Sequence, residues 1–457
     1  MKKEQLEQIL NRLLSTGGDF GEIFLEESIS KNFNYIDNRL DKYNISSVKG
    51  MGLRLAKDRN IYYGAINDFN MPSIFQTIDR LNRNINDKVI YKDIKLNKLV
   101  KYSYKEIKRL DAFKIKSKLE ELNKLIRSKD KRVEQVRISV SNKIQNVIIA
   151  RENGRYVFEE RPLTRIFITT YFKDKDSTST STYSKGIRGG MEIFDLIDFE
   201  KEINEMIIEG IDKLYAGPCV GKKMPVIISN AFGGVIFHEA CGHAMEATSV
   251  ADGMSVLAND LDKNIASKKV TIIDDGTIPN EWGTTIVDDE GNNTQKNVLI
   301  KDGKLVNFLI DEINNRKMEM KITGSGRRES YLYAPTSRMN NTYLKPGTDT
   351  LEDMIKSIKF GLYAKKLGGG CVSPETGDFN FNCDLAYMIR DGKICECVNS
   401  ASLIGNTKEI LKNVEMVGND LALGCGMCGS ISGYVPVNVG EPSIKLSEIL
   451  VGGSSDQ

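Results

Sequence analysis

The chain has 457 residues, of which 28% are charged, and its 64 lysines and arginines nearly balance its 62 aspartates and glutamates. The net charge therefore favours neither nucleic acid, nor an anionic membrane, nor an acidic substrate, so any partner must be recognised locally; we expect no nucleic-acid or membrane partner. No run approaches the roughly 18 apolar residues of a membrane-spanning helix, and the first residues lack the apolar core of a signal peptide. The sequence therefore predicts a soluble, cytoplasmic protein of two or three domains, because single cores stop growing at roughly 250 to 300 residues.

The first half of the chain shows the hydrophobic periods of both helices and strands. Apolar residues three and four positions apart indicate helices, and strict alternation indicates half-buried strands. Such a mixture predicts an α+β region in which helices cover antiparallel strands. In chain order, the expected elements are a helix over 2–15, strands over 20–30 and 51–66, helices over 71–84 and 102–130, strands over 134–174, a polar loop or edge strand over 176–190, and a helix near 194–215.

A domain boundary is expected at about residue 217, where the helical pattern gives way to short apolar strands and turns. It divides the chain into an N-terminal α+β region, 1–217, with candidate subdomains 1–90 and 91–217, and a C-terminal region, 218–457. In the C-terminal region, the tetrapeptides KDGK and RDGK place Asp-Gly between alternating runs, which is a strong hairpin signal. We therefore expect a β-rich, barrel-like C-terminal domain with few helices.

Both histidines of the chain lie in one short segment, GVIFHEACGHAMEA. His238, Glu239 and His243 form the pattern H-E-x-x-x-H, in which the histidines would lie roughly 140° apart on an ideal helix. A single π-helical bulge would bring them to one side, and Gly242 supplies a backbone that tolerates this distortion. The segment thus predicts a bulged or broken helix whose two histidines bind a metal ion.

Glu239 is the candidate general base of this segment. In a zinc site, the metal lowers the pKa of water to about 7 and polarises a carbonyl group. A neighbouring carboxylate can take the proton of that water and pass it to the leaving amine. The competing interpretation is that each histidine is an ordinary structural side chain. Metal binding is favoured because the only two histidines bracket a glutamate within six residues.

A catalytic zinc ion usually has three protein ligands and one water, so a third ligand is needed. Glu246 lies near one helical turn beyond the second histidine. Cys241 lies inside the motif, but we expect it to point away from the face that the histidines share. Cys428, in the segment GCGMCGS, is placed in a glycine-rich turn before a strand, and Cys425 is its near neighbour. The residues alone leave these four candidates open.

Two arginines in the segment GSGRRESY, Arg327 and Arg328, are candidate substrate-binding residues. An arginine fork could bind a peptide carboxylate or stabilise a tetrahedral oxyanion. The alternative is a surface or interdomain ion pair, which is a common role of arginine. The nearby segment 288–291 predicts a tight turn between strands.

Several long motifs occur in order: HEACGHAMEA, DDGTIPNEWGTTIVDDEG, GSGRRESY, RMNNTYLKPG, MVGNDLAL and VPVNVGEPSIKL. Together they resemble the TldD side of the TldD/TldE (PmbA) metallopeptidase family, over essentially the whole chain. The resemblance implies a zinc-dependent peptidase with one zinc ion per chain, which degrades unfolded or leader-type peptides held in an extended form. It also implies that His238, His243 and Cys428 bind the zinc ion and that Glu239 is the general base.

The same resemblance implies a dimer in which the metal is enclosed between barrel domains. The partner would be a second copy or a TldE/PmbA-like paralogue. Two other functions compete with the peptidase. One is a non-catalytic partner subunit like the TldE side of the family, which lacks the metal motif. The other is a structural zinc-binding protein, which chelation would unfold.

Overall fold

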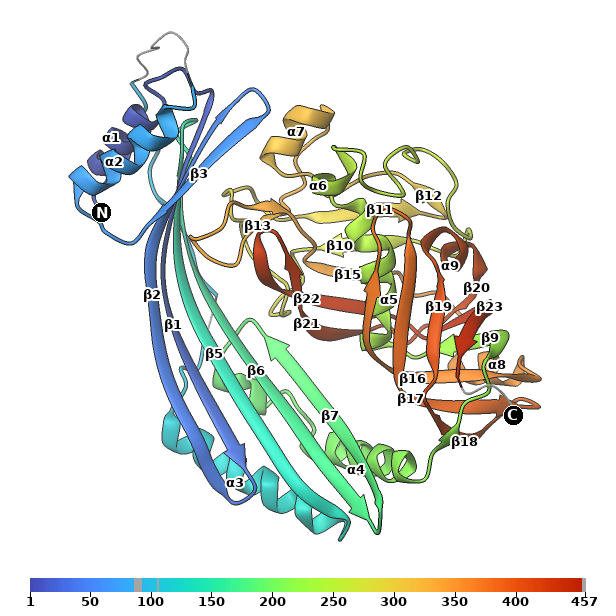
Figure 1. The fold of residues 1–457 in the computed structure, drawn as a ribbon. Helices are drawn as coiled ribbons and strands as arrows, with labels where there is room; N and C mark the ends of the chain where they lie inside the picture. Colours follow the sequence, from blue (N-terminus) through green and yellow to red (C-terminus); the bar gives the residue numbers. More distant parts are fainter. Residues whose placement is uncertain (86–92, 105–106, 454–457) are drawn as a thin grey trace.

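The computed structural model describes residues 1–85, 93–104 and 107–453, and it confirms the predicted α+β class (Figure 1). Figure 1 shows a long bent sheet from the N-terminal half beside a more compact β-rich body from the C-terminal half. The expected subdomain boundary at residues 90 and 91 lies outside the described residues. No helix within the described ranges combines the length and the apolar character of a bilayer span.

The N-terminal sheet has seven strands, in the order β3-β2-β1-β5-β6-β4, with β7 paired to β6. Its four central strands have 17 or 19 residues each, which makes them roughly 60 Å long. The polar segment after β6 is an edge strand that pairs with β6 over its whole length. The strands are β1 (Phe20–Ile36), β2 (Arg39–Lys57), β3 (Asn60–Ile66), β4 (Val100–Tyr102), β5 (Val133–Arg151), β6 (Tyr156–Asp174) and β7 (Ser177–Ile187).

Two pairs of helices cover the two ends of this sheet (Figure 1). α1 (Lys3–Leu13) and α2 (Met71–Asn82) share one apolar cluster, and α3 (Ala112–Lys129) and α4 (Phe199–Leu214) share another. The helix predicted over 102–130 is ten residues shorter at its start. Asp111 caps the N-terminus of α3, because its side chain accepts hydrogen bonds from two backbone amides of the first helical turn. The helix therefore begins at the next residue.

The C-terminal half contains a closed five-stranded barrel, which confirms the predicted barrel-like fold. The strand order is β16-β9-β23-β19-β17, and β17 pairs with β16 to close the ring. The RDGK tetrapeptide joins β17 to β18, and its Asp-Gly has two positive φ angles, 44° and 72°, which a type I′ turn requires. These strands are β9 (Lys222–Ile228), β16 (Phe360–Val372), β17 (Asp378–Arg390), β18 (Lys393–Asn399), β19 (Ser402–Asn406) and β23 (Ile444–Gly452), with β8 (Gly217–Pro218) and β20 (Val414–Val417) beside them.

A second sheet of the C-terminal half has the order β12-β11-β10-β15-β22-β21. The KDGK tetrapeptide forms the predicted hairpin between β11 and β12. Cys428 lies inside β21, so the expectation of a glycine-rich turn at this position is wrong. The strands are β10 (Ile272–Asp275), β11 (Lys296–Lys301), β12 (Lys304–Leu305), β15 (Asn341–Leu344), β21 (Ala422–Ser430) and β22 (Gly433–Glu441); short elements elsewhere are β13 (Gly326–Arg327), β14 (Thr336–Ser337), α6 (Ala247–Val250), α7 (Glu312–Met318), α8 (Leu351–Lys356) and α9 (Thr407–Asn413).

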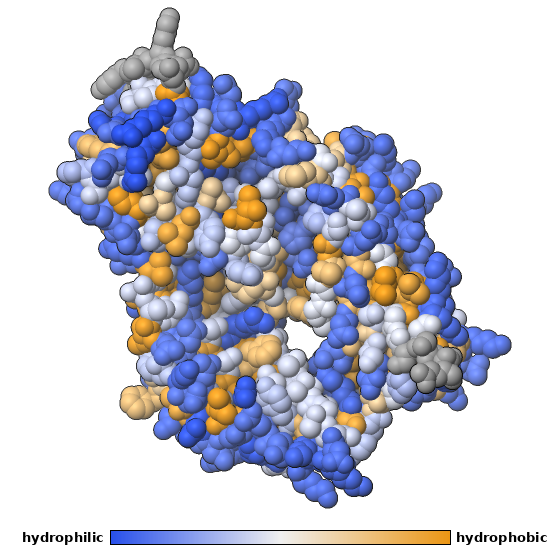
Figure 2. All heavy atoms as spheres, viewed as in Figure 1, coloured by the Kyte–Doolittle hydropathy of each residue, from blue (hydrophilic) through white to orange (hydrophobic). Residues whose placement is uncertain are grey.

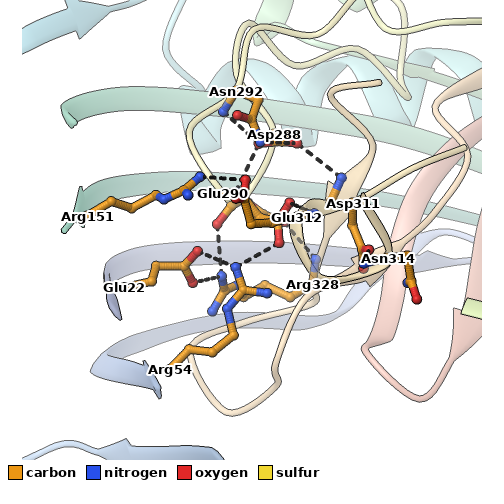
Figure 3. Close-up of polar contacts among 12 residues, drawn as sticks. Glu22, Arg54, Arg151, Asp288, Glu290, Asn292, Asp311, Glu312, Asn314 and Arg328 are labelled. Carbon is orange, nitrogen blue, oxygen red and sulfur yellow. Dashed lines mark hydrogen bonds and ion pairs between the residues drawn. The ribbon is translucent and has the colours of Figure 1, made fainter. Parts of the chain in front are cut away.

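A buried ion-pair network joins the two halves (Figure 3). Arg54 of β2 lies opposite Glu22 of β1 and donates to it at 2.6 Å. The same guanidinium donates at 2.7 Å to Glu290, which the predicted turn at 288–291 carries across from the C-terminal half. Arg328 adds a second ion pair to Glu22. Because all four side chains are fully buried, their charges can be balanced only by each other and by nearby polar groups.

The Glu290 carboxyl should make stability depend on pH. Burial raises its pKa to about 8, against the opposing charge of Arg54, whereas an unfolded glutamate titrates near 4.5. Between these values the folded protein holds more protons at this site than the unfolded chain does. The free energy of unfolding therefore falls as the pH rises from about 5 to 8, by at most about 1.4 kcal/mol per pH unit from this group.

We expect Glu290→Gln to remove this contribution, because glutamine keeps the shape of the neutral carboxyl and does not titrate. Urea unfolding at several pH values between about 5 and 8 would measure the effect as a flatter pH profile. Glu27→Gln is the matched control, since Glu27 is 61% exposed at the side chain. Parallel profiles for Glu290→Gln and the unmodified protein would contradict the assignment.

Candidate metal centre

The histidine segment follows β9 and changes its helical winding within a few residues. One α-helical turn, α5 (Val235–Phe237), leads into a π-helical turn over His238–Gly242, and a 3-10 turn begins at His243. A π-helical turn contains one more residue than an α-helical turn. The two imidazole rings consequently lie 5.2 Å apart between centroids, with an angle of 82° between their planes.

Gly242 is needed here for space rather than for an unusual backbone angle. Its φ is −58°, an ordinary helical value that any residue adopts. A Cβ atom at this position would lie only 2.1 Å from the sulfur of Met339. A side chain at Gly242 would therefore require Met339 to move, and the expected need for a permissive backbone is not what the structure shows.

Three side chains converge beside the π-helical turn: His238, His243 and Cys428. One ligand atom of each lies within 4.8 Å of the other two. The Cys428 Sγ is 3.3 Å from Nε2 of His243. His238 is 2% exposed, and among the described residues its Nδ1 has no hydrogen-bond partner. Two imidazoles and one thiol form a donor set that suits a transition metal which accepts nitrogen and sulfur ligands.

The protonation of this cluster favours a thiolate. Burial opposes ionisation of Cys428, but the adjacent His238 and His243 lower the pKa of its thiol to about 3. Burial likewise disfavours a charged His243, but Glu246 and the Cys428 sulfur raise the pKa of its imidazole well above the ordinary value. A thiolate is the form of cysteine that binds metals, so Cys428 has the charge state of a ligand.

Glu246 contacts the far side of the His243 ring. Its Oε2 lies 3.0 Å from Nδ1 of His243, which leaves Nε2 directed toward Cys428. Such a carboxylate fixes the orientation of a metal-binding imidazole. Arg338 lies behind this pair, with its Nε 3.7 Å from Glu246, and it also donates to the Cys428 carbonyl oxygen at 2.6 Å. Arg338 was not among the predicted site residues, and its only sequence signal is its place at the start of the RMNNTYLKPG motif.

The other two candidate thiols lie away from this cluster. Cys241 is fully buried in the apolar core of the C-terminal half, where burial raises the pKa of its thiol. Cys425 is on β21, packed with Leu163 and Trp282, and its Sγ lies 3.2 Å from the hydroxyl oxygen of Ser184. Of the four candidates for a third ligand, only Cys428 contributes a donor atom to the group of three.

Glu239 lies at the open side of the cluster. Its Oε2 is 3.6 Å from Nε2 of His243, and its side chain is 29% exposed. The carboxylate is therefore close to the histidine nitrogen that faces Cys428, and solvent can reach it. A carboxylate in this position can exchange protons with a water molecule at the cluster.

Arg327 and Arg328 are both buried, and they make different contacts. Arg328 forms its ion pair with Glu22 and donates at 2.8 Å to a backbone carbonyl oxygen of Asp289. Such contacts are those expected if Arg328 forms an interdomain ion pair, which was the alternative to substrate binding. Arg327 donates instead to the backbone carbonyl oxygens of Met339 and Pro436, the latter at 2.8 Å.

Comparison with known families gives matches along nearly the whole chain. Residues 21–85 match the PmbA/TldA metallopeptidase domain 1, residues 105–215 match the central domain, and residues 221–453 match the C-terminal domain. The third match contains the histidine segment and Cys428.

Individual relatives agree with this assignment, and a solved structure shares the fold. The metalloprotease TldD homolog of Buchnera aphidicola subsp. Acyrthosiphon pisum is 32% identical over 98% of this chain and 95% of its own length. That of Haemophilus influenzae is 31% identical, with coverages of 96% and 93%. The fold is shared with the crystal structure of TldE from Thermococcus kodakarensis, at a TM-score of 0.75 and 20% identity over 98% of this chain and 100% of that one. The chain therefore belongs to the TldD/PmbA family of metallopeptidases.

Proposed function

We propose that this metallopeptidase is zinc-dependent and hydrolyses peptide bonds in unfolded or leader-type peptides. His238, His243 and Cys428 would hold one zinc ion per chain, and Glu239 would be the general base. The supporting observation is the convergence of the three ligand atoms within 4.8 Å, with the Glu239 carboxylate 3.6 Å from His243. Two nitrogens and one sulfur, with a position left for water, match the composition of catalytic zinc sites.

The side chains of the cluster have separate tasks in this proposal. A zinc ion held by His238, His243 and Cys428 would supply Lewis acidity for acidifying water and polarising a carbonyl oxygen. Glu239 accepts the proton of the attacking water and returns it to the leaving amine. Glu246 holds Nδ1 of His243, so that Nε2 stays directed at the centre. The low pKa of the Cys428 thiol keeps this ligand anionic at neutral pH.

The burial of the ligands supports an extended substrate. His238 is 2% exposed and Cys428 is 4% exposed, so the surface of a folded protein cannot bring a carbonyl group to them. An unfolded or leader-type peptide can enter as a single extended chain. We also propose that the enzyme works in the cytoplasm as a dimer, with a second copy or with a TldE/PmbA-like paralogue. The likeness of its fold to TldE supports a pairing of two similar chains.

The decisive test compares zinc content and peptide hydrolysis in the purified chain and in Cys428→Ala. We expect about one zinc ion per chain in the unmodified protein, as a single catalytic site requires. Loss of a supporting residue weakens metal affinity by about 10–100-fold, so loss of Cys428 itself should weaken it at least as much and abolish hydrolysis. Elemental analysis after dialysis and an assay on an unstructured peptide provide the two readouts.

Cys425→Ala is the matched control, because Cys425 lies on the same strand and is comparably buried. We expect this variant to retain zinc and activity. Full zinc content in Cys428→Ala would contradict the ligand assignment. A chelator should silence hydrolysis without unfolding the protein, whereas loss of the fold on chelation would indicate a structural zinc ion.

A further inference from the structure

A cavity of about 340 Å³ lies between the N-terminal sheet and the C-terminal half, and Figure 2 shows an opening between these two parts of the molecule. Side chains from β5 and β6 line one wall, and Met427, Tyr434 and Pro436 of the β21–β22 hairpin line another. Met427 pairs with Pro436, whereas Cys428 pairs with Val435. Because neighbouring residues of a strand point to opposite faces, the hairpin separates this cavity from the metal centre.

The lining of the cavity carries an excess of positive charge. Six cationic side chains face three carboxylates. Carboxylates behind the wall balance some of these cations: Lys143 is 3.4 Å from Glu26, and Arg328 pairs with Glu22. The cations are Lys143, Arg161, Arg165, Arg188, Arg327 and Arg328, and the carboxylates are Asp288, Asp289 and Glu329.

Arg188 and Arg327 have no carboxylate partner among the described residues. Arg188 is 3% exposed, and neither its Nε nor its Nη1 has a hydrogen-bond partner in the described part of the chain. Arg327 is also 3% exposed and donates to backbone carbonyl oxygens. The nearby Asp289 is already paired with Arg161. Asp288 accepts hydrogen bonds from backbone amides.

Two buried guanidinium groups without a counter-ion are unfavourable. Burial lowers the pKa of Arg327 to about 9, and the charge of Arg188 adds to this effect. At neutral pH both groups nevertheless keep their protons, so an anion in the cavity would be attracted by both charges. Arginine presents its N–H groups as a fork that fits the two oxygens of a carboxylate or a phosphate.

We propose that Arg188 and Arg327 bind the carboxylate of a small organic acid in this cavity. The cavity holds far more than an inorganic anion, because a water molecule occupies only about 30 Å³. Trp282, Leu163 and Met427 supply an apolar part of the wall, against which the body of the acid would pack. Binding at this site does not require peptide hydrolysis. The binding proposal can therefore be tested independently of the proposed function.

The test uses N-acetyl-L-phenylalanine, its uncharged carboxamide and inorganic phosphate as probes in calorimetric titrations of the full chain. We expect the carboxylate to bind and the carboxamide to bind about 10- to 100-fold more weakly, because charge-assisted hydrogen bonds are lost. Phosphate should bind more weakly than the carboxylate, because it leaves the apolar wall uncovered. Equal affinity for the acid and its carboxamide, or stronger binding of phosphate, would overturn the proposal.

Arg188→Met should weaken binding of the acid by about 10- to 100-fold. The variant removes an unpaired buried charge, so its melting temperature without ligand should equal or exceed that of the unmodified protein. Arg137→Met, at an exposed position on β5, is the control and should bind normally. Cys428→Ala should also bind normally. Binding that is lost in Cys428→Ala but kept in Arg188→Met would place the acid at the metal centre and overturn the assignment.

Discussion

Glu239→Gln is expected to lower kcat for an unstructured peptide by about 10²–10⁴-fold, the usual contribution of a general base. Glutamine keeps the shape of the side chain but cannot accept the proton of the attacking water. Since Glu239 is not one of the three converging side chains proposed to hold zinc, zinc content should remain at the level of the unmodified protein. Steady-state hydrolysis and elemental analysis of the same preparation would measure both quantities.

Glu246→Gln provides a contrast within the same segment. Its carboxylate contacts Nδ1 of His243, so we expect about 10–100-fold weaker zinc affinity, with activity restored by excess zinc. Excess zinc should not restore Glu239→Gln. Hydrolysis by Glu239→Gln within tenfold of the unmodified rate would rule out the assigned base, whatever the zinc content.

Arg54→Ala is expected to lower the free energy of unfolding by about 3–5 kcal/mol, because it removes a cation from the buried Glu22 carboxylate and the hydrogen-bond donor from the buried Glu290 carboxyl. The Arg54 guanidinium bonds both Glu22 and Glu290, and all three side chains are fully buried. It also lies 4.7 Å from the ring centroid of Phe20, so packing is lost as well. Urea unfolding at neutral pH, followed by circular dichroism, would measure the change.

Lys356→Ala is the control for this loss, because Lys356 forms an exposed pair with Glu352 one helical turn away. Such pairs contribute only about 0.2–0.5 kcal/mol. If Arg54→Ala costs no more than Lys356→Ala, the buried network does not hold the two halves together. The zinc content of Arg54→Ala under native conditions should stay unchanged, since the network is separate from the three metal-binding candidates.

Local patterns predicted those elements whose cause is local. α1 follows from buried residues at helical spacing, and the two hairpins follow from Asp-Gly, which readily adopts positive φ. The start of the helix predicted over 102–130 was wrong: α3 begins at Ala112, and Tyr102 belongs to β4, whose structure depends on a distant partner. Residues of β4 pair in parallel with β6, more than fifty positions further along the chain. The hydrophobic periodicity within the segment cannot predict a pairing with so distant a strand.

In the candidate site, too, some features follow from local sequence and others depend on distant parts of the chain. The spacing of His238 and His243 favours a bulged turn, and the structure has a π-helical turn there. Cys428 lies 185 residues beyond His243, so residue spacing left it among four candidates and only the family resemblance singled it out. The bond between Arg54 and Glu290 spans 236 residues and joins a strand of the N-terminal sheet to a turn of the C-terminal half. Contacts of this kind depend on the assembled fold.

The π-helical turn relates this segment to a more familiar zinc-protease pattern. Deleting Gly242 would change HEACGH to HEACH, in which the histidines are four residues apart, the spacing that an ordinary α-helix places on one face. The wider turn absorbs the additional residue, so two imidazoles reach one side by a different winding of the same backbone. The two zinc-protease patterns thus differ by a single residue, and each can place its two histidines on one side of the backbone. The sulfur of Met339 occupies the space beside the additional residue.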